Sequence, residues 1–599
     1  MPPMGGGPRG RGTDTRKPKD TKATIARLLT YIGRYKVQIG IAFFFVILRT
    51  VASLASSYIL RPLINNYIIE GAGLEKLGGL TAGLAILAGI YLVNIFSTYM
   101  ESRLMIHVSQ NSLERIRNEL FTKLQKLPIR YFDTNQTGDL MSRFTNDVDN
   151  IGMMLDNTLV NLVSSILTLV GTMAMMIYTN IWLTIITVIM VPIFAKIAGV
   201  LAKYGQKYYR AQQAALGALN GYVEESVNGQ KVVKVFNHEE QCIEEFTELN
   251  SDLRDKQIMA QFFGGVMGPI MGGLGQVSYA LTALIGGVLC VATGFDVGGL
   301  TIFVNYSRQF SFPISNMANQ VTTVMAALAG AERVFTMMDQ TPEDLEPENP
   351  VSMEGIVPRI ELKHVTFGYN EDKIVLKDIN VVAEPGQKIA FVGSTGAGKT
   401  TVTNLLNRFY DIQEGTITIG GIDLKAFSGS ELRKNIAMVL QDTHLFTGTV
   451  RENIRFGRLD ATDEEVEAAA KTASAHSFIM RLDKGYDTLL EGDGANLSQG
   501  QRQLLNIARA AISNAPILVL DEATSSVDTR TERHIEHGMD RLMKNRTTFV
   551  IAHRLSTVRN ADQILVLEHG EIIERGTHDE LLEKKGRYYE LYTGKAELD

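Results

Sequence analysis

The chain has 599 residues, of which 45% are hydrophobic and 21% are charged, and its formal net charge is -6. This length is too great for one hydrophobic core, so several structural units are expected. The two cysteines, Cys242 and Cys290, exclude a disulfide framework, and neither has the spacing of a metal site.

The chain opens with a basic arm of low complexity. Residues 1–36 carry nine Lys/Arg against two Asp, and no small-residue cleavage site follows the first apolar run, which argues against a secretory signal. The Gly/Pro/Arg-rich composition predicts a disordered arm over residues 1–24. A basic arm could bind nucleic acid. Because this one adjoins an apolar span, a cytoplasmic tail that faces lipid is the favoured interpretation.

The N-terminal half contains stretches long enough to cross a bilayer, which takes about 20 predominantly apolar residues. Six stretches qualify: 37–60, 77–100, 156–179, 181–203, 266–291 and 297–322. A buried helix of a soluble protein could mimic one such stretch, but not six in one block. The sequence therefore predicts a membrane protein with a six-helix transmembrane domain over residues 25–340, followed by a linker over 341–358.

The connections between these stretches predict their orientation. Segments 101–155 and 203–258 carry seven Lys/Arg each, whereas the opposite connections are short and poor in basic residues. By the positive-inside rule, the two long connections and both chain ends face the cytoplasm. We interpret each long connection as helices that continue beyond the membrane and return. Their tips, at 132–140 and 233–242, would contact a cytoplasmic domain.

Two arginines lie inside the predicted spans, Arg49 and Arg308. A charge in hydrocarbon is costly, so such residues usually face a cavity or a partner. Two interpretations of each arginine are equally favoured. In the first, the arginine lines a substrate pathway. In the second, it forms a structural ion pair or extends its side chain to the membrane interface.

From Arg359 onward, alternating strand-like residues predict an α/β domain over residues 359–599. A strand over 388–392 precedes Gly393-Ser-Thr-Gly-Ala-Gly-Lys-Thr400, and a helix over 401–408 follows it, which is the context of a nucleotide phosphate loop. Backbone N–H groups of the loop and the positive end of the helix would surround the phosphates. The residues expected to bind nucleotide here are Gly393, Ser394, Thr395, Gly396, Ala397, Gly398, Lys399, Thr400 and Thr401.

The same chemistry predicts specific roles for four residues. Lys399 is expected to reach the β- and γ-phosphates, and Thr400 is expected to ligate Mg²⁺. A second apolar strand over 517–520 ends in Asp521 and Glu522. Asp521 would bind the metal, and Glu522 would polarise the attacking water as general base. Together with the phosphate loop, this pair predicts a nucleotidase.

The remaining motifs resemble those of ATP-binding cassette (ABC) proteins. Leu497-Ser-Gln-Gly-Gln501 resembles the signature L-S-G-G-Q, with Gln499 in place of the first Gly. Gln441 after a strand, Ser525-Ser-Val-Asp528 and His553 follow the order and spacing of the family, and Tyr369 resembles its adenine-stacking aromatic residue. Six spans before one cassette resemble a half-size ABC exporter.

The resemblance implies ATP and Mg²⁺ as cofactors and a head-to-tail dimer of cassettes. Gln441 would contact the metal and the attacking water, and His553 would contact the γ-phosphate. Each ATP would lie between the phosphate loop of one cassette and the signature of the other. The signature residues expected to contact nucleotide are Ser498, Gln499, Gly500 and Gln501, together with Asp528.

The chain departs from the family pattern at Gln499 and in Glu491-Gly-Asp-Gly494, where the family usually has G-E-x-G. Glu522 and His553 are intact. This combination resembles the catalytic partner of a heterodimeric exporter, so a heterodimer is favoured over a homodimer.

Three other classes of protein share parts of this pattern. Six spans reject a soluble cassette ATPase of DNA maintenance, so no nucleic-acid partner is expected. The fusion of spans to a cassette argues against an importer, and nothing favours a non-transporting receptor or channel. The expected function is ATP-driven export or flipping of an amphipathic drug or lipid across a plasma (inner) membrane, with peptide export as the alternative.

Overall fold

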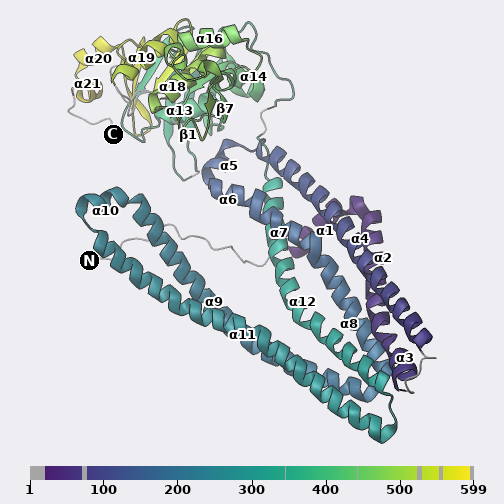
Figure 1. Ribbon diagram of the computed structural model, residues 1–599. Coiled ribbons are helices and arrows are strands. Elements are labelled where there is room, and N and C mark those ends of the chain that lie inside the picture. The colour runs from purple at the N-terminus through teal and green to yellow at the C-terminus, as the bar shows by residue number, and fades with distance from the viewer. Residues whose placement is uncertain are drawn as a thin grey trace. The chain divides into compact units, whose positions relative to one another are not determined.

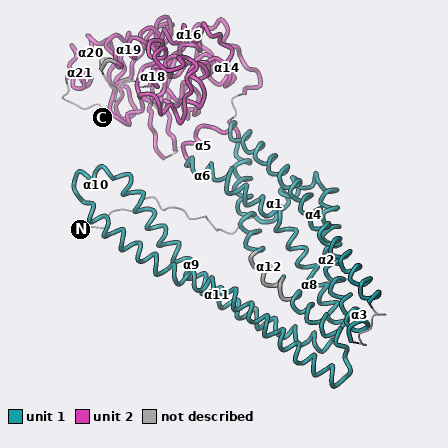
Figure 2. The backbone as a smooth tube through the Cα atoms, viewed as in Figure 1, with its two compact units in different colours: residues 1–126, 135–341 teal, residues 127–134, 342–599 magenta. Residues whose placement is uncertain are grey.

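The computed structural model describes residues 20–69, 77–343, 346–370, 372–441, 443–521, 529–551 and 558–593. The chain divides into two compact units (Figure 2). Unit 1 comprises Met1–Lys126 and Asn135–Thr341, and unit 2 comprises Leu127–Thr134 and Pro342–Asp599.

Unit 1 contains helices and short connections, with no strand among its described residues (Figure 1). Its long helices are α2 (Lys36–Tyr58), α4 (Leu77–Leu124), α8 (Leu159–Thr179), α9 (Ile181–Asn228), α11 (Glu239–Thr293) and α12 (Val297–Met338). Its shorter helices are α1 (Thr21–Ile32), α3 (Leu60–Ile64), α6 (Thr137–Ser142), α7 (Val148–Met153) and α10 (Gln230–Phe236). Three π-helical turns, Asn65–Ile69, Arg143–Asp147 and Met154–Thr158, continue these helices.

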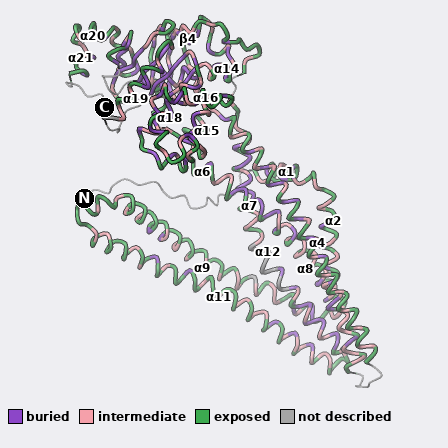
Figure 3. Tube along the Cα trace, turned by 45° about the horizontal axis from the view of Figure 1, so that its top comes forward, coloured by how far each residue is buried: buried purple, intermediate pink, exposed green. Residues whose placement is uncertain are grey.

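The six-helix prediction is confirmed, because the described residues contain six helical stretches long and apolar enough to cross a membrane. The predicted spans fall on α2 and the start of α3, on α4, on the third π-helical turn and α8, on α9, on α11 and on α12. The sixth apolar stretch of the described residues is Gln320–Met338, which overlaps the predicted span 297–322 only at its end. The most apolar window of α4 contains no buried residue, as expected for a helix that faces lipid. Exposed and half-buried positions also run the length of α9 and α11 (Figure 3).

Three of these helices are much longer than a bilayer requires. α4 and α9 have 48 residues each and α11 has 55. At about 1.5 Å of rise per residue, each exceeds a hydrocarbon core of about 30 Å by a wide margin. The long helical extensions predicted from segments 101–155 and 203–258 are therefore present.

Asp296 connects the beginning of α12 to the end of the first span. Its carboxylate accepts hydrogen bonds from the guanidinium of Arg61, at 2.5 and 2.9 Å, and from the amide of Asn65, at 2.6 Å. It also caps α12 by accepting from the N–H of Gly299, at 2.7 Å. Partial burial raises the pKa of Asp296, but these hydrogen bonds outweigh burial and lower the pKa to about 2.

Unit 2 is an α/β domain with two main sheets and a two-stranded ribbon. The six-stranded sheet has the order β12-β11-β3-β10-β9-β6, in which only the edge strand β12 is antiparallel to its neighbour. A four-stranded antiparallel sheet has the order β2-β1-β4-β5, and β7 pairs with β8. The strands are β1 (Ile360–Phe367), β2 (Leu376–Ala383), β3 (Lys388–Val392), β4 (Glu414–Ile419), β5 (Ile422–Asp423), β6 (Ile436–Val439), β7 (Gly448–Thr449), β8 (Leu489–Leu490), β9 (Ile517–Asp521), β10 (Thr547–Ile551), β11 (Gln563–Glu568) and β12 (Glu571–Gly576).

Helices surround these sheets, and one comes from a distant part of the sequence: α5 (Ile129–Thr134) groups with unit 2. The others are α13 (Lys399–Leu406), α14 (Gly429–Lys434), α15 (Val450–Arg455), α16 (Asp463–Thr472), α17 (His476–Ile479), α18 (Gln499–Ile512), α19 (Thr529–Met543), α20 (His578–Lys584) and α21 (Arg587–Tyr592). The central strand β9 is buried at every position, as expected for a parallel strand covered on both faces.

Part of the predicted arm is helical, and part of the predicted linker packs on a core. The side chain of Asp20 accepts from the N–H of Ala23 and caps α1, so helix begins inside the predicted arm 1–24; residues 1–19 lie outside the described part. The predicted linker 341–358 packs on unit 2, because Met353 is 7% exposed and belongs to the core of that unit. The guanidinium of Arg433 also binds the carboxylate of Glu343 at 2.6 Å.

We expect Asp296→Ala to lower the unfolding temperature of the purified protein by several degrees. The substitution removes an N-cap worth about 1 kcal/mol and charge-assisted hydrogen bonds worth about 1.5–3 kcal/mol each. The matched control is Asp252→Ala, which removes an exposed ion pair with Lys256 that is worth only about 0.3–0.5 kcal/mol. Equal unfolding temperatures for the two variants would contradict the structural role of Asp296.

Candidate functional site

The phosphate loop connects β3, inside the six-stranded sheet, to the N-terminus of α13. Two glycines are required by its backbone. Gly393 has φ 155°, and a Cβ added there would lie 2.2 Å from the carbonyl oxygen of Leu567. Gly398 has φ 105°, and its Cβ would lie 2.6 Å from the side chain of Leu376. The loop therefore approaches its neighbours more closely than any other residue type allows.

Lys399 is the first residue of α13 and is 5% exposed. Its ammonium donates to the carbonyl oxygens of Gly393 and Ser394, so the charge is held over the loop. Thr400 is exposed in the first turn of α13, where the helix contributes partial positive charge. In the rest of the loop, Ser394 is half-buried, Thr395 and Gly396 are exposed, and Ala397 and Thr401 are buried.

The register of the parallel strands aligns the expected metal ligand with this loop. Asp521 pairs with Ile551 on β10, and Ile551 pairs with Phe391 on β3. Asp521 therefore ends β9 at the same edge of the sheet at which β3 enters the phosphate loop. Its side chain is 5% exposed. Ligands of open α/β sheets bind at this carboxyl edge.

Gln441 approaches the same edge from the other side of β9. It follows β6 by two residues, and Val439 on β6 pairs with Leu520 on β9. Gln441 is exposed. The structure thus brings Gln441, Asp521 and the phosphate loop to one edge. Glu522, Asp528 and His553 lie outside the described residues, although β9 and β10 end immediately before the segments that contain them.

Tyr369 lies beside the first turns of α13. Its hydroxyl donates to the hydroxyl of Thr401 and accepts from the amide of Asn404, both at 3.2 Å. Its ring is perpendicular to that of Tyr410, with centroids 4.9 Å apart. The sequence prediction missed Asn404 and Tyr410. Asn404 could have been found because it lies three residues after Thr401 on one helical face.

Tyr410 connects this aromatic cluster to α5. Its hydroxyl donates to the carboxylate of Asp133, and burial together with this hydrogen bond raises the pKa of Tyr410 above its ordinary value. The segment Leu127–Thr134, which includes the start of the predicted tip 132–140, groups with unit 2. No signal in the sequence relates Tyr410 to Asp133, because they are far apart along the chain.

The predicted signature forms the N-terminus of α18. The hydroxyl of Ser498 accepts from the N–H of Gln501, and the side chain of Gln501 accepts from the N–H of Ser498, which is a capping box. The first-turn N–H groups of Gln499 and Gly500 have no partner within the helix. Gln499 is exposed and Gly500 is buried, so the substituted side chain points outward from this helix end.

The altered loop before the signature has a structural role. Asp493 adopts φ 62°, and its carboxylate accepts from the N–H of Leu445 at 2.7 Å. Gly494, at φ 71°, follows it directly. The carboxylate thereby holds the loop that precedes α18 against the segment that follows Gln441.

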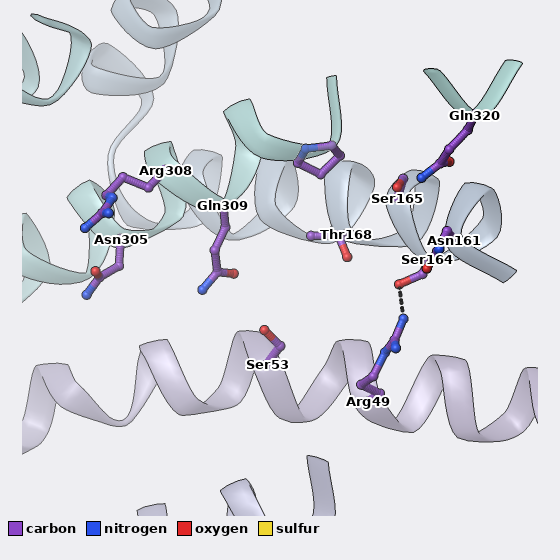
Figure 4. Close-up of a pocket in the computed structure, with 11 residues that line it drawn as sticks. Arg49, Ser53, Asn161, Ser164, Ser165, Thr168, Asn305, Arg308, Gln309 and Gln320 are labelled. Carbon is purple, nitrogen blue, oxygen red and sulfur yellow. Dashed lines mark hydrogen bonds between the residues drawn. The ribbon is translucent and has the colours of Figure 1, made fainter. Parts of the chain in front are cut away.

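A separate cavity of about 760 Å³ lies within unit 1, among α2, α8 and α12 (Figure 4). Arg49 and Arg308 both line it. Arg49 donates to the hydroxyl of Ser164 at 2.7 Å and pairs with the carboxylate of Glu101 at 3.2 Å. The two interpretations of Arg49 are therefore compatible, since this residue forms an ion pair and also faces the cavity.

Comparison with known proteins decides the family. A family model described as ABC transporter transmembrane region matches residues 39–314, and one described as ABC transporter matches residues 376–525. The chain is 44% identical over 581 residues to an uncharacterized ABC transporter ATP-binding protein, YfiC, of Bacillus subtilis (strain 168), and the match covers 97% of this chain and 96% of that protein. The chain belongs to the ABC transporter family.

Two other relatives of this ABC transporter are named as a transporter and as a flippase. The chain is 42% identical over 525 residues, 88% of its length and 83% of the relative, to a fatty acid ABC transporter ATP-binding/permease protein of Mycobacterium bovis. It is 38% identical over 506 residues, 84% of each chain, to an ATP-dependent lipid A-core flippase of Syntrophus aciditrophicus (strain SB).

A solved structure extends the likeness to the whole fold. The structure of a bacterial Atm1-family ABC exporter with ATP bound matches with a TM-score of 0.74 and 27% identity, covering 94% of this chain and 98% of that one. The protein is therefore a half-size ABC exporter whose cassette binds ATP and couples an ATPase to transport, as predicted.

We expect Tyr369→Ala to weaken ATP binding by the full-length exporter about tenfold or more, because stacking of an aromatic ring on a base contributes about 1–3 kcal/mol. The matched control is Tyr369→Phe, which retains the ring and loses only the hydrogen bonds to Thr401 and Asn404. Titration with a fluorescent ATP analogue measures the dissociation constant. An alanine variant that binds as tightly as the native protein would exclude Tyr369 as the stacking residue.

Proposed function

We propose that this exporter hydrolyses Mg-ATP at the interface of two cassettes and uses the cycle to move an amphipathic molecule across the membrane by alternating access. The observation that supports the proposal most strongly is the common edge of the six-stranded sheet. Strand register brings the phosphate loop, Asp521 and Gln441 to that edge.

The donors at this edge suit Mg²⁺ and a triphosphate. Thr400, Gln441 and Asp521 offer hydroxyl, amide and carboxylate oxygens, which are the ligands that Mg²⁺ prefers. Lys399 and the first turn of α13 supply positive charge for the phosphates. We assign Glu522 the role of general base and His553 that of γ-phosphate contact. Bound Mg²⁺ would neutralise the charge that develops on the phosphates.

A single cassette supplies only half of each proposed site. In this scheme the exposed N-terminus of α18 faces the γ-phosphate held by a partner cassette, and the N–H groups of Gln499 and Gly500 would attract that charge. Ser498, Gln501 and Asp528 would complete that surface. In this scheme ATP joins the cassettes, and its hydrolysis releases them.

We further propose that the partner is a different half-transporter. Gln499 places an exposed side chain at the helix end where the family has glycine, and such a side chain would crowd a γ-phosphate. Glu522 is present as the catalytic residue. The chain would then supply the catalytic residues of an active site and the substituted signature of a weaker one. A homodimer is the second candidate.

The substrate class is proposed from relatives and architecture. The relatives include a fatty acid transporter, a lipid A-core flippase and a putative multidrug export protein, YgaD, of Bacillus subtilis (strain 168). The substrates in these names are lipids or drugs, so they favour an amphipathic drug or lipid over a peptide as the substrate of this chain. The Lys/Arg bias of the long connections supports a plasma-membrane exporter whose cassette and chain ends face the cytoplasm.

The test is ATP turnover by the full-length chain in lipid nanodiscs, alone and after co-expression with a candidate half-transporter. We expect weak turnover alone and a large increase with the partner, and we expect Glu522→Gln to abolish the increase. Vanadate trapping should retain one nucleotide per pair of chains. Asp252→Ala is the control for surface substitution.

Two results would contradict parts of this proposal. Strong turnover by the chain alone, with two equal trapped nucleotides per dimer, would exclude the heterodimer and establish a homodimer. Turnover that survives Glu522→Gln would exclude Glu522 as the general base.

A further inference from the structure

The cavity of unit 1 is polar, although the helices that enclose it are apolar overall. Guanidinium, amide and hydroxyl groups line it, and no carboxylate is among its described lining residues. Figure 4 shows Arg49 and Ser53 on one side, and Asn305, Arg308 and Gln309 on the other. A polar cavity within a membrane domain requires a polar occupant, either water or the polar part of a ligand.

The charge of Arg49 is already balanced. Its guanidinium lies 3.2 Å from the carboxylate of Glu101, which is 4% exposed, and it also donates to Ser164. The amide of Asn94 donates to the backbone carbonyl oxygen of Arg49, at 3.2 Å. The half-buried Arg49 and the buried Glu101 together form a neutral pair at the wall of the cavity.

No described residue of this chain balances the charge of Arg308. Arg308 lies in the predicted sixth span, its side chain is exposed, and it forms no ion pair with any carboxylate in the described part of the chain. An arginine at the centre of a membrane helix costs about 2.5–3.5 kcal/mol. The described lining of the cavity therefore carries one uncompensated positive charge.

We propose that this cavity binds the anionic headgroup of an amphiphile, a phosphate or a carboxylate, with Arg308 as its counter-charge. A guanidinium presents parallel N–H groups that match two oxygens of either anion. The amide of Asn305, on the preceding turn of α12, and the hydroxyl of Ser53 face the same space (Figure 4). The inference rests on the proposed export function, and it adds that the substrate carries a negative charge.

Two buried acceptors indicate that the headgroup also carries hydrogen-bond donors. The amide nitrogen of Gln309 donates to the hydroxyl of Ser57 at 2.8 Å, whereas its side-chain oxygen is buried and has no hydrogen-bond partner among the described residues. The side-chain oxygen of Gln320, which lines the same cavity, is also without one. A buried acceptor left without a donor costs about 1–3 kcal/mol. Hydroxyl or N–H groups beside the anion would satisfy both.

The same charges disfavour the alternative substrate, an apolar cation. A cation in this cavity would lie near the guanidinium groups of Arg308 and Arg49. The described lining offers no carboxylate to attract it. Like charges a few ångströms apart repel strongly in a medium of low dielectric constant.

The test uses the full-length exporter, with its partner if turnover requires one, in nanodiscs of zwitterionic lipid. The probes share one chain length: hexadecyl phosphate, hexadecyltrimethylammonium and hexadecanol. Inorganic phosphate is added in a separate arm to distinguish a lipid headgroup from a free anion. We expect hexadecyl phosphate to bind and to stimulate ATP turnover, and we expect the other three probes to bind at least about tenfold more weakly.

Arg308→Gln should reduce the affinity for hexadecyl phosphate about tenfold or more, and Arg308→Lys should restore part of it, because lysine keeps the charge and loses the bidentate geometry. The matched control is Arg103→Gln, which removes an exposed arginine of α4 that does not line the cavity. The preference for the phosphate probe should persist in the control.

Three outcomes would overturn the inference. The first is binding of hexadecyltrimethylammonium that is as tight as that of hexadecyl phosphate, or tighter. The second is a preference for hexadecyl phosphate that is unchanged in Arg308→Gln. The third is tight binding of inorganic phosphate alone, which would indicate a free anion as the ligand. If no probe binds while turnover still depends on Glu522, the inference fails and the proposed function stands. If turnover does not depend on Glu522, the proposed function fails separately.

Discussion

In hydrocarbon, a backbone N–H or C=O without a hydrogen-bond partner costs several kcal/mol, and the whole of unit 1 reflects this constraint. Its described residues are almost entirely helical, because a helix satisfies its backbone within one segment. Pro192, Pro269 and Pro313 are the exceptions inside α9, α11 and α12, since each removes one backbone donor. Pro313 lines the polar cavity.

Three of these helices, α4, α9 and α11, are longer than a bilayer requires. A helix that is continuous over 48 or 55 residues transmits a displacement along its length, whereas a loop would absorb it. In unit 2 the contact between Asp133 and Tyr410 places α5 next to the aromatic cluster around Tyr369. The residue predicted to stack on the base, Tyr369, and the helix α5 are thus joined through one side chain, Tyr410.

Much of this organisation could be predicted from local sequence. Spans follow from apolar length, and β1, β3 and the phosphate loop follow from alternation and glycine spacing, because those signals lie within a few residues of one another. The contacts of Asp296 with Arg61, of Tyr410 with Asp133 and of Arg433 with Glu343 could not be predicted. They join residues far apart in the sequence, and only packing brings such residues together. The roles of Glu522, Asp528 and His553 remain predictions.

The packing of Met353 changes where the cassette begins as a folding unit. A fragment cut at Arg359, where the strand pattern starts, would leave a space in the core among β1, β4 and their neighbours, and it would leave Arg433 without Glu343. The segment before β1 therefore belongs to the cassette's own hydrophobic core. Evolutionary exchange of cassettes between exporters would succeed more often if the crossover preceded Glu343 than if it fell at the start of β1.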